Sequence, residues 1–309
     1  MNGQSTLRFG TTAYAPLASG SVIRPTLTSV SLSSTTTILI GTSGPASLPG
    51  NASAAVCNAV FDIALKNGTV LPGALSACSV GPGVTAITAA LANGTAYSDG
   101  MTVTLKANQT ALKAGDQTAA APLFVPPTAA LAIAPTILSA SLTAADTITV
   151  VLPVASSLDT SACNSAFELR AAASSTAKSS PFSACSLAVN NTQAVLTLAS
   201  ASTYTSGDIL DIKSGNDKLL AGSTAYVPQS VTVLPTITTA TLVSSTVVRV
   251  ALPVVSSIPA PYSADDCARS IVVAAASSTA AKAISACALS ADKKALLVTL
   301  AAAYQPGEL

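Results

Sequence analysis

Short segments in which apolar and polar residues alternate recur along the whole chain. Residues 148–152 and 248–252 are rich in β-branched side chains and end at a proline, and residues 38–40 are their counterpart nearer the N-terminus. Alternation with a period of two is typical of strands that bury one face. The inward face of residues 148–152 would carry Ile148, Val150 and Leu152. The pattern therefore predicts an all-β protein.

These strand-like segments are organised in three repeats. Each repeat opens with proline, threonine and an aliphatic residue, beginning at Pro25, Pro135 and Pro235. The starts are 110 and 100 residues apart, close to the size of an immunoglobulin-type sandwich. The predicted domains are residues 25–134, 135–234 and 235–309, preceded by an N-terminal segment of residues 1–24.

The cysteines follow the same period, with one pair in each repeat. The members of a pair are 21, 22 and 20 residues apart: Cys57 with Cys78, Cys163 with Cys185, and Cys267 with Cys287. The chain contains no histidine, and no Cys-x-x-Cys motif is present, so a zinc site is not expected. Three disulfides within the domains are predicted instead. Each disulfide closes a loop of about 20 residues and should stabilise the fold by roughly 3 kcal/mol. Buried free thiols in a reducing compartment are the alternative.

Two further motifs have structural or covalent roles. A Tyr-x-x-Gly motif occurs late in each repeat, at Tyr97, Tyr204 and Tyr304; its place is similar to that of the tyrosine corner of Greek-key sandwiches. Five Asn-x-Ser/Thr sequons, which are otherwise ordinary turn asparagines, are candidate N-glycosylation sites: Asn51, Asn67, Asn93, Asn108 and Asn190. Sequons and paired cysteines together favour an extracellular location, whether secreted, on the cell surface or in a cell wall.

Composition argues against several classes of function. Charged residues make up 9% of the chain and the net charge is +1, so nucleic acid is not an expected partner. The apolar runs are far shorter than the roughly 20 residues of a membrane-spanning helix. No recurring pair of carboxylates and no nucleophile motif is present, and Asp265–Asp266 lacks the further ligands of a calcium loop. We expect neither an enzyme nor a bound metal or cofactor.

The proline-threonine starts, the paired cysteines and the Tyr-x-x-Gly motifs together resemble tandem immunoglobulin-like β-sandwich modules. Such modules occur in large extracellular surface and cell-wall proteins, especially the Ala/Ser/Thr-rich proteins of algae. The resemblance covers the whole chain. It implies a structural or adhesive role without an active site.

The two ends of the chain match neighbouring parts of one repeat. Residues 10–16 are similar to residues 222–228, which close the second repeat, and residues 304–309 are similar to residues 204–210 just before them. If a second copy followed Leu309, its Pro25 would lie 99 residues after Pro235, one short of the preceding spacing. The third domain is therefore expected to lack its closing strands.

A sandwich that lacks its closing strands exposes an unpaired sheet edge. We expect residues 1–24 of a neighbouring subunit to fill this gap, with inserted side chains drawn from Leu7, Phe9, Tyr14, Val22 and Ile23. Strand donation of this kind resembles donor-strand complementation in pilus subunits. It predicts a glycosylated extracellular filament of identical subunits joined head to tail. The alternative is a fragment of a longer multi-repeat adhesin or wall protein, and the mass of the native chain distinguishes the two.

Overall fold

The structure is a computed structural model of the chain. It describes residues 24–50, 52–80, 84–118, 121–172, 176–200, 204–237, 239–258, 262–274 and 281–304, together with the backbone of residues 8–9 and 12–13. Its contacts separate two compact units, Met1–Ile133 and Ala134–Leu309. The predicted division between residues 134 and 135 stays a prediction. The further division at 234/235 remains a prediction.

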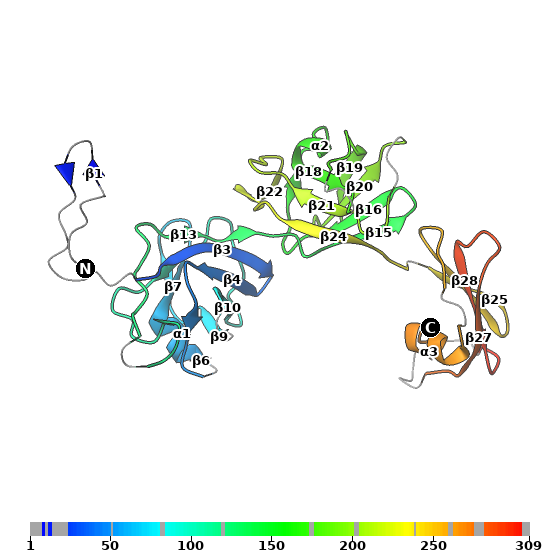
Figure 1. Ribbon diagram of the computed structural model, residues 1–309, viewed down its shortest axis with the longest axis horizontal. Coiled ribbons are helices and arrows are strands. Elements are labelled where there is room, and N and C mark those ends of the chain that lie inside the picture. The colour runs from blue at the N-terminus through cyan, green and yellow to red at the C-terminus, as the bar shows by residue number, and fades with distance from the viewer. Residues whose placement is uncertain are drawn as a thin grey trace. The chain divides into compact units, whose positions relative to one another are not determined.

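The first repeat forms two antiparallel sheets (Figure 1). One contains, in spatial order, β3 (Leu27–Ser34), β4 (Thr37–Thr42), β10 (Ala86–Leu91), β9 (Leu75–Ser79) and β6 (Ala52–Ser53). The other contains β13 (Leu131–Ala132), β11 (Thr102–Leu105), β7 (Phe61–Ala64) and β8 (Val70–Leu71). Alternate residues such as Ile38 and Ile40 are fully buried, as their period-two pattern predicts.

In the second repeat, the corresponding strands form one continuous seven-stranded sheet. Its strands follow the order β18 (Phe167–Arg170), β21 (Ile209–Ile212), β24 (Ser230–Pro235), β15 (Ser139–Ala144), β16 (Thr147–Val151), β20 (Gln193–Leu198) and β19 (Phe182–Ala188). The first and last strands of this repeat, β15 and β24, pair in parallel, with Ala140 opposite Val233. Ile148, Val150 and Leu152 are all buried, as expected from the sequence.

This strand order is that of an immunoglobulin-type sandwich. When these seven strands are numbered along the chain, strands one, two, five and four form one layer, β15-β16-β20-β19, and strands three, six and seven form the other, β18-β21-β24. The pairing of β24 with β15 joins the two layers into one seven-stranded sheet. The constant-type immunoglobulin domain groups its strands in this way. The predicted all-β, immunoglobulin-like architecture therefore holds for this repeat.

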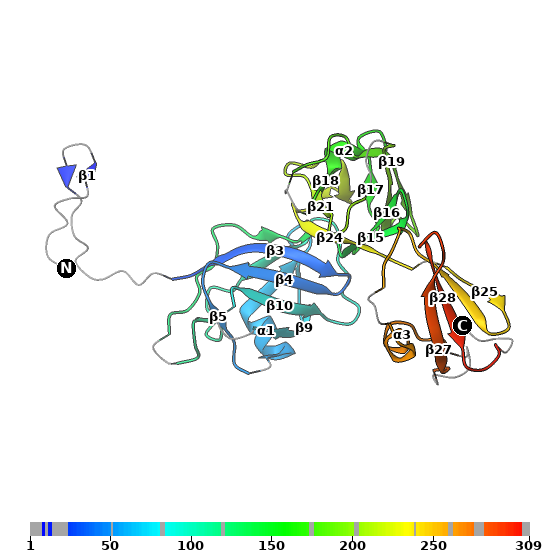
Figure 2. The same cartoon turned by 45° about the vertical axis from the view of Figure 1, so that its right-hand side comes forward.

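In the third repeat, the described residues form only the first of these two layers. It has the order β25 (Ala240–Ser244), β26 (Val247–Ala251), β28 (Ala295–Leu300) and β27 (Ile284–Leu289). Figure 2 shows this sheet beside the short helix α3 (Ala264–Ser270). The described part of residues 236–304 contains no strand equivalent to β21 or β24.

A short helix carries the first cysteine of each pair, which the sequence pattern did not predict. These helices are α1 (Ala54–Val60), α2 (Cys163–Ala166) and α3. Each disulfide therefore joins a helix to a strand rather than two strands or a strand and a loop. None of the described helices is long and apolar enough to cross a membrane.

Short strand pairs complete the structure at its edges. β5 (Ala46–Ser47) pairs with β12 (Lys113–Ala114). β22 (Leu219–Ala221) lies between β17 (Ser157–Leu158) and β23 (Thr224–Ala225). β1 (Arg8–Phe9) and β2 (Thr12–Ala13) form a hairpin of their own, and β14 (Ala134–Pro135) opens the second repeat.

Candidate functional site

An open apolar groove lies on the sheet of the third repeat. It encloses about 640 Å³, and its walls include Ile237, Ala240, Leu242, Val250, Ile271 and Val273. The first three lie on or just before β25, and the last two follow α3. The groove therefore opens on the sheet face that would meet the second sheet of a complete sandwich.

Equivalent positions in the second repeat are closed. Leu142 and Ile137 are 0% and 1% exposed, whereas Leu242 and Ile237, 100 positions later, are 46% and 47% exposed. Both pairs have identical side chains, so the difference comes from what covers them. Because exposed aliphatic surface costs roughly 25 cal/mol per Å², the groove is an unfavourable surface in isolation.

In the second repeat, two strands supply the missing cover. Leu210 and Ile212 on β21 are buried, and Val233 on β24 is fully buried opposite Ala140. The strand β24 also takes up the free edge of β15 through parallel pairing. In the described part of the third repeat, β25 pairs only with β26. The groove therefore combines an exposed apolar face with an open strand edge.

The tyrosines of the Tyr-x-x-Gly motifs lie near these strands. The Tyr204 hydroxyl donates a hydrogen bond to the Val233 carbonyl oxygen, at 3.0 Å. In a tyrosine corner the hydroxyl bonds to backbone a few residues upstream. The Tyr204 hydroxyl bonds instead to the last strand of its domain. Tyr304, the counterpart of Tyr204 in the third repeat, lines the open groove. In the second repeat, Tyr204 bonds to β24. Tyr97 is half-buried.

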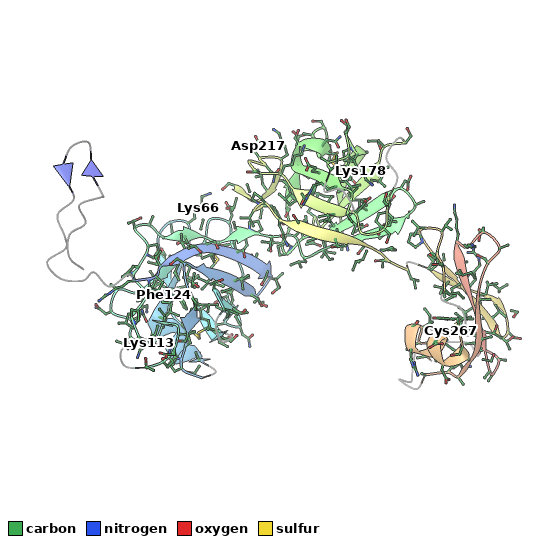
Figure 3. All side chains as sticks on the ribbon, in the orientation of Figure 1. Lys66, Lys113, Phe124, Lys178, Asp217 and Cys267 are labelled. Carbon is green, nitrogen blue, oxygen red and sulfur yellow. A yellow bond between two sulfur atoms is a disulfide. The ribbon has the colours of Figure 1, made fainter. Side chains whose placement is uncertain are left out.

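The structure contains all three expected disulfides, Cys57–Cys78, Cys163–Cys185 and Cys267–Cys287. In the third repeat, Cys267 is fully buried within a core with Val298 and Leu300 (Figure 3). The bond therefore fixes α3 to the sheet beside the groove and keeps Ile271 and Val273, which follow α3, in its wall.

The described sequon asparagines are accessible. Asn67, Asn93, Asn108 and Asn190 are exposed, and Asn51 lies outside the described residues. Asn67 accepts a hydrogen bond from the Thr69 backbone N–H, a local bond typical of a turn. The glycans themselves remain a prediction.

The predicted donor residues lie at the edge of what the structure describes. Leu7, Tyr14, Val22 and Ile23 are outside the described residues, and only the backbone of Phe9 is described, within β1. The β1–β2 hairpin pairs Arg8 with Ala13 and Phe9 with Thr12. Their insertion into a neighbour therefore stays a prediction.

Two of the repeats have a lysine–aspartate ion pair near the tyrosine motif, which the sequence pattern did not predict. Lys178 pairs with the fully buried Asp208 at the turn after Tyr204, and Lys66 lies 3.1 Å from Asp99 at the turn after Tyr97. The counterpart in the third repeat, Lys282, donates to the Ala303 carbonyl oxygen at 2.8 Å. The lysines stand at different distances from the tyrosine motif along the chain, so no fixed spacing signals them.

In the second repeat, one charged pair connects the strands that cover the positions equivalent to the groove. Asp211 on β21 accepts hydrogen bonds from the Arg170 guanidinium on β18 and from the Ser230 hydroxyl on β24. Burial raises the pKa of Asp211, but these hydrogen bonds and the charge of Arg170 outweigh it and hold the pKa below its usual value. A carboxylate thus joins three strands of the second sheet.

The acidic pair considered for calcium has a different role. The Asp266 side chain accepts hydrogen bonds from the Ser263 backbone N–H and hydroxyl, while the Ser263 hydroxyl accepts from the Asp266 backbone N–H. This capping box begins α3. The hydrogen bond from Ser263 also lowers the pKa of Asp266. Within the described residues, no group of three or more Cys, Asp or Glu side chains is placed to hold a metal ion.

No protein-family profile and no curated protein matches the chain. Among solved structures, the N-terminal part of the bacterial S-layer protein SbsC is similar, with 16% identity over 68% of this chain and 44% of that chain, at a TM-score of 0.27. The FN1–FN3 domains of chicken CNTN1 are similar with 8% identity over 74% of this chain and 75% of that chain, at a TM-score of 0.20. The chain thus spans less than half the length of the first of these proteins. TM-scores this low do not establish a shared arrangement, so the groove is interpreted from its own geometry.

Proposed function

We propose that the chain is the structural subunit of an extracellular glycoprotein filament that assembles head to tail by strand donation. The observation that carries this proposal is the contrast between Leu142, fully buried beneath its own domain's strands, and Leu242, 46% exposed in the open groove. A strand from another copy would bury Leu242 and pair with the edge of β25. Both gains favour assembly.

A positional rule selects the inserted residue. A β-branched side chain stands two residues before the proline that opens each repeat: Ile23, Ile133 and Val233. Ile133 and Val233 are both fully buried within their own repeats. Ile23 of a second copy therefore takes the place of Val233 in the third repeat, on a strand parallel to β25. The Tyr304 hydroxyl then bonds to the Ile23 carbonyl oxygen, as Tyr204 does to Val233.

The donor and acceptor surfaces are different parts of the chain. Such a heterologous contact adds copies in one direction and forms an open filament unless the rotation closes a ring. Disulfides in every repeat suit an oxidising environment, and the exposed sequons suit glycosylation there. The role proposed is structural, with no catalysis.

Deletion of residues 1–24 tests the proposal. The full chain should form fibres visible by electron microscopy, and the deletion variant should remain monomeric with its disulfides and strand content intact. Leu39→Asp is the matched control, because Leu39 is also an exposed aliphatic residue on a strand but lies outside the groove. Fibres that persist after the deletion would overturn the proposal.

The mass of the native protein gives a second, independent test. A subunit that assembles non-covalently should have the 30.2 kDa of this chain after denaturation and removal of glycans. A much larger chain whose own continuation fills the groove would show that repeats are joined covalently and would contradict head-to-tail assembly.

A further inference from the structure

The N-terminal hairpin has the same register as a hairpin that closes the second repeat. β1 and β2 pair Arg8 with Ala13 and Phe9 with Thr12. β22 and β23 pair Leu220 with Ala225 and Ala221 with Thr224. Adding 212 to each number of the first hairpin gives the second, and residues 10–14 and 222–226 share the Gly-x-Thr-Ala-Tyr sequence. The two hairpins are therefore equivalent parts of the repeat, and Tyr14 corresponds to Tyr226.

In the second repeat, this hairpin docks through a hydroxyl pair. Tyr226 is 2% exposed, and its hydroxyl lies 2.7 Å from the Ser156 hydroxyl oxygen. Ser156 donates its one hydroxyl proton to the Val154 carbonyl oxygen at 2.9 Å, so Tyr226 is the donor to Ser156. Next to this contact, Ser157 on β17 pairs with Leu220 on β22.

The third repeat presents the same acceptor without a cover in the described residues. Ser256 donates to the Val254 carbonyl oxygen at 3.0 Å, as Ser156 does to Val154. The backbone N–H of Ser256 donates to Lys293, and that of Ser156 to the equivalent Asn191, both at 2.9 Å. Ser156 is buried, however, while Ser256 is half-buried. The local structure is thus preformed, and its serine oxygen retains a lone pair for a tyrosine hydroxyl.

The first repeat shows that the two positions vary together. Phe124 there takes the place of Tyr226, because each N–H bonds to the leucine carbonyl of the preceding edge strand, Leu112 or Leu219. Ala46 takes the place of Ser156, because Ser47 pairs with β12 as Ser157 pairs with β22. Phe124 and Ala46 are both buried, and Phe124 is labelled in Figure 3. A phenylalanine thus accompanies an alanine, and a tyrosine accompanies a serine.

We infer that the β1–β2 hairpin of one copy docks on residues 254–258 of another, with Tyr14 donating its hydroxyl proton to Ser256. Arg8 then pairs with Ser257, and Leu7 with Ile258, in the register of Leu220 with Ser157 and Leu219 with Leu158. This inference rests on the proposed function, since it specifies a second contact within the same head-to-tail joint. The segment that binds residues 254–258 belongs to a second copy of this chain.

The critical concentration for assembly of the full chain tests the register. Tyr14→Phe and Ser256→Ala should each raise it about 5- to 30-fold, because each removes the buried hydrogen bond between the two hydroxyls. The double variant should return to within about threefold of the unmodified chain, since it recreates the Phe124 and Ala46 pair of the first repeat. Tyr226→Phe is the matched control, because it removes the same hydroxyl within one subunit and should leave the critical concentration unchanged.

The outcomes separate this inference from the proposed function. Fibres whose critical concentration is unaffected by Tyr14→Phe, or a double variant whose defects simply add, would overturn the register while leaving strand donation intact. A full chain that forms no fibres at any concentration would overturn both. Cross-linking provides a second readout: Arg8→Cys with Ser257→Cys should give covalent ladders, whereas Phe9→Cys with Ser257→Cys should not, because a one-residue shift turns the side chain to the other face.

Discussion

Leu142 and Leu242 occupy the same position on the first strand of successive repeats, yet the first is fully buried and the second is 46% exposed. The neighbouring strands β16 and β26 are also equivalent, pairing Leu142 with Ile148 and Leu242 with Val248. The exposure of Leu242 therefore reflects the lack of covering strands in the described part of the third repeat and not a different fold of the strand.

Leu242→Asp separates assembly from folding. Because Leu242 is half exposed in the free subunit, the free energy of unfolding of the variant should lie within about 1 kcal/mol of that of the unmodified chain. A carboxylate beneath the donated strand would be desolvated without a partner, so fibre formation should be abolished. Sedimentation measures the polymer fraction.

The matched control is Leu142→Ala, which should lower the free energy of unfolding by about 2 to 5 kcal/mol and leave the acceptor groove intact. A Leu242→Asp chain that polymerises normally would show that the groove is not the contact surface.

Removing the disulfide of the second repeat should weaken its fold. Cys163→Ser with Cys185→Ser opens a loop of 22 residues, for which chain entropy gives a loss of about 3 kcal/mol. Denaturant unfolding measures the loss. If the double variant were as stable as the oxidised chain, the disulfide would not contribute to the free energy of unfolding.

Acid should destabilise the second repeat through Asp211. Its pKa is lower in the folded chain than in an unfolded one, so its contribution is present above the unfolded carboxyl pKa of about 3.9 and is lost as the pH falls through the folded pKa. Asp211→Asn should cost about 1 to 3 kcal/mol at neutral pH and should make unfolding less sensitive to pH below 5. Equal acid sensitivity in both proteins would contradict this role.

The accessible sequons should carry N-linked glycans when the chain is secreted from eukaryotic cells. Asn67, Asn93, Asn108 and Asn190 are exposed on turns or strand ends. Peptide mass spectrometry after enzymatic removal of the glycans should find aspartate at these positions. Thr69→Ala is the control for Asn67, since it removes the sequon and keeps the asparagine. Unmodified asparagine at all four positions would remove the glycoprotein part of the account.

The sequence predicted three repeats because the same marker residues recur in the same order in each of them. Prolines, cysteine pairs and alternating aliphatic runs located the repeats, and the structure confirms the strands and the disulfides. The short helices were missed because α2 covers only Cys163–Ala166, too short for helical periodicity to appear. The Ser263 and Asp266 capping box was a usable signal for α3, but the aspartates were weighed against a calcium site, which they do not fit, and not as the start of a helix.

The alignment of the repeats predicted a third domain without its closing strands, but no local pattern showed which residues would line the resulting groove. Ile237, Ala240 and Leu242 are identical to Ile137, Ala140 and Leu142, which are buried one repeat earlier. Their exposure follows from which strands lie beside them. The hydroxyl pair of Ser156 and Tyr226, 70 residues apart, likewise became visible only once the fold brought the two together.

Electron cryo-microscopy of the native fibres tests the central claim most directly. The account predicts a strand from a second copy running parallel to β25, with Ile23 opposite Ala240, as Val233 lies opposite Ala140, and with the Tyr14 hydroxyl at Ser256. A groove left open to solvent in the assembled fibre, or one filled by an unbroken continuation of the same chain, would contradict it.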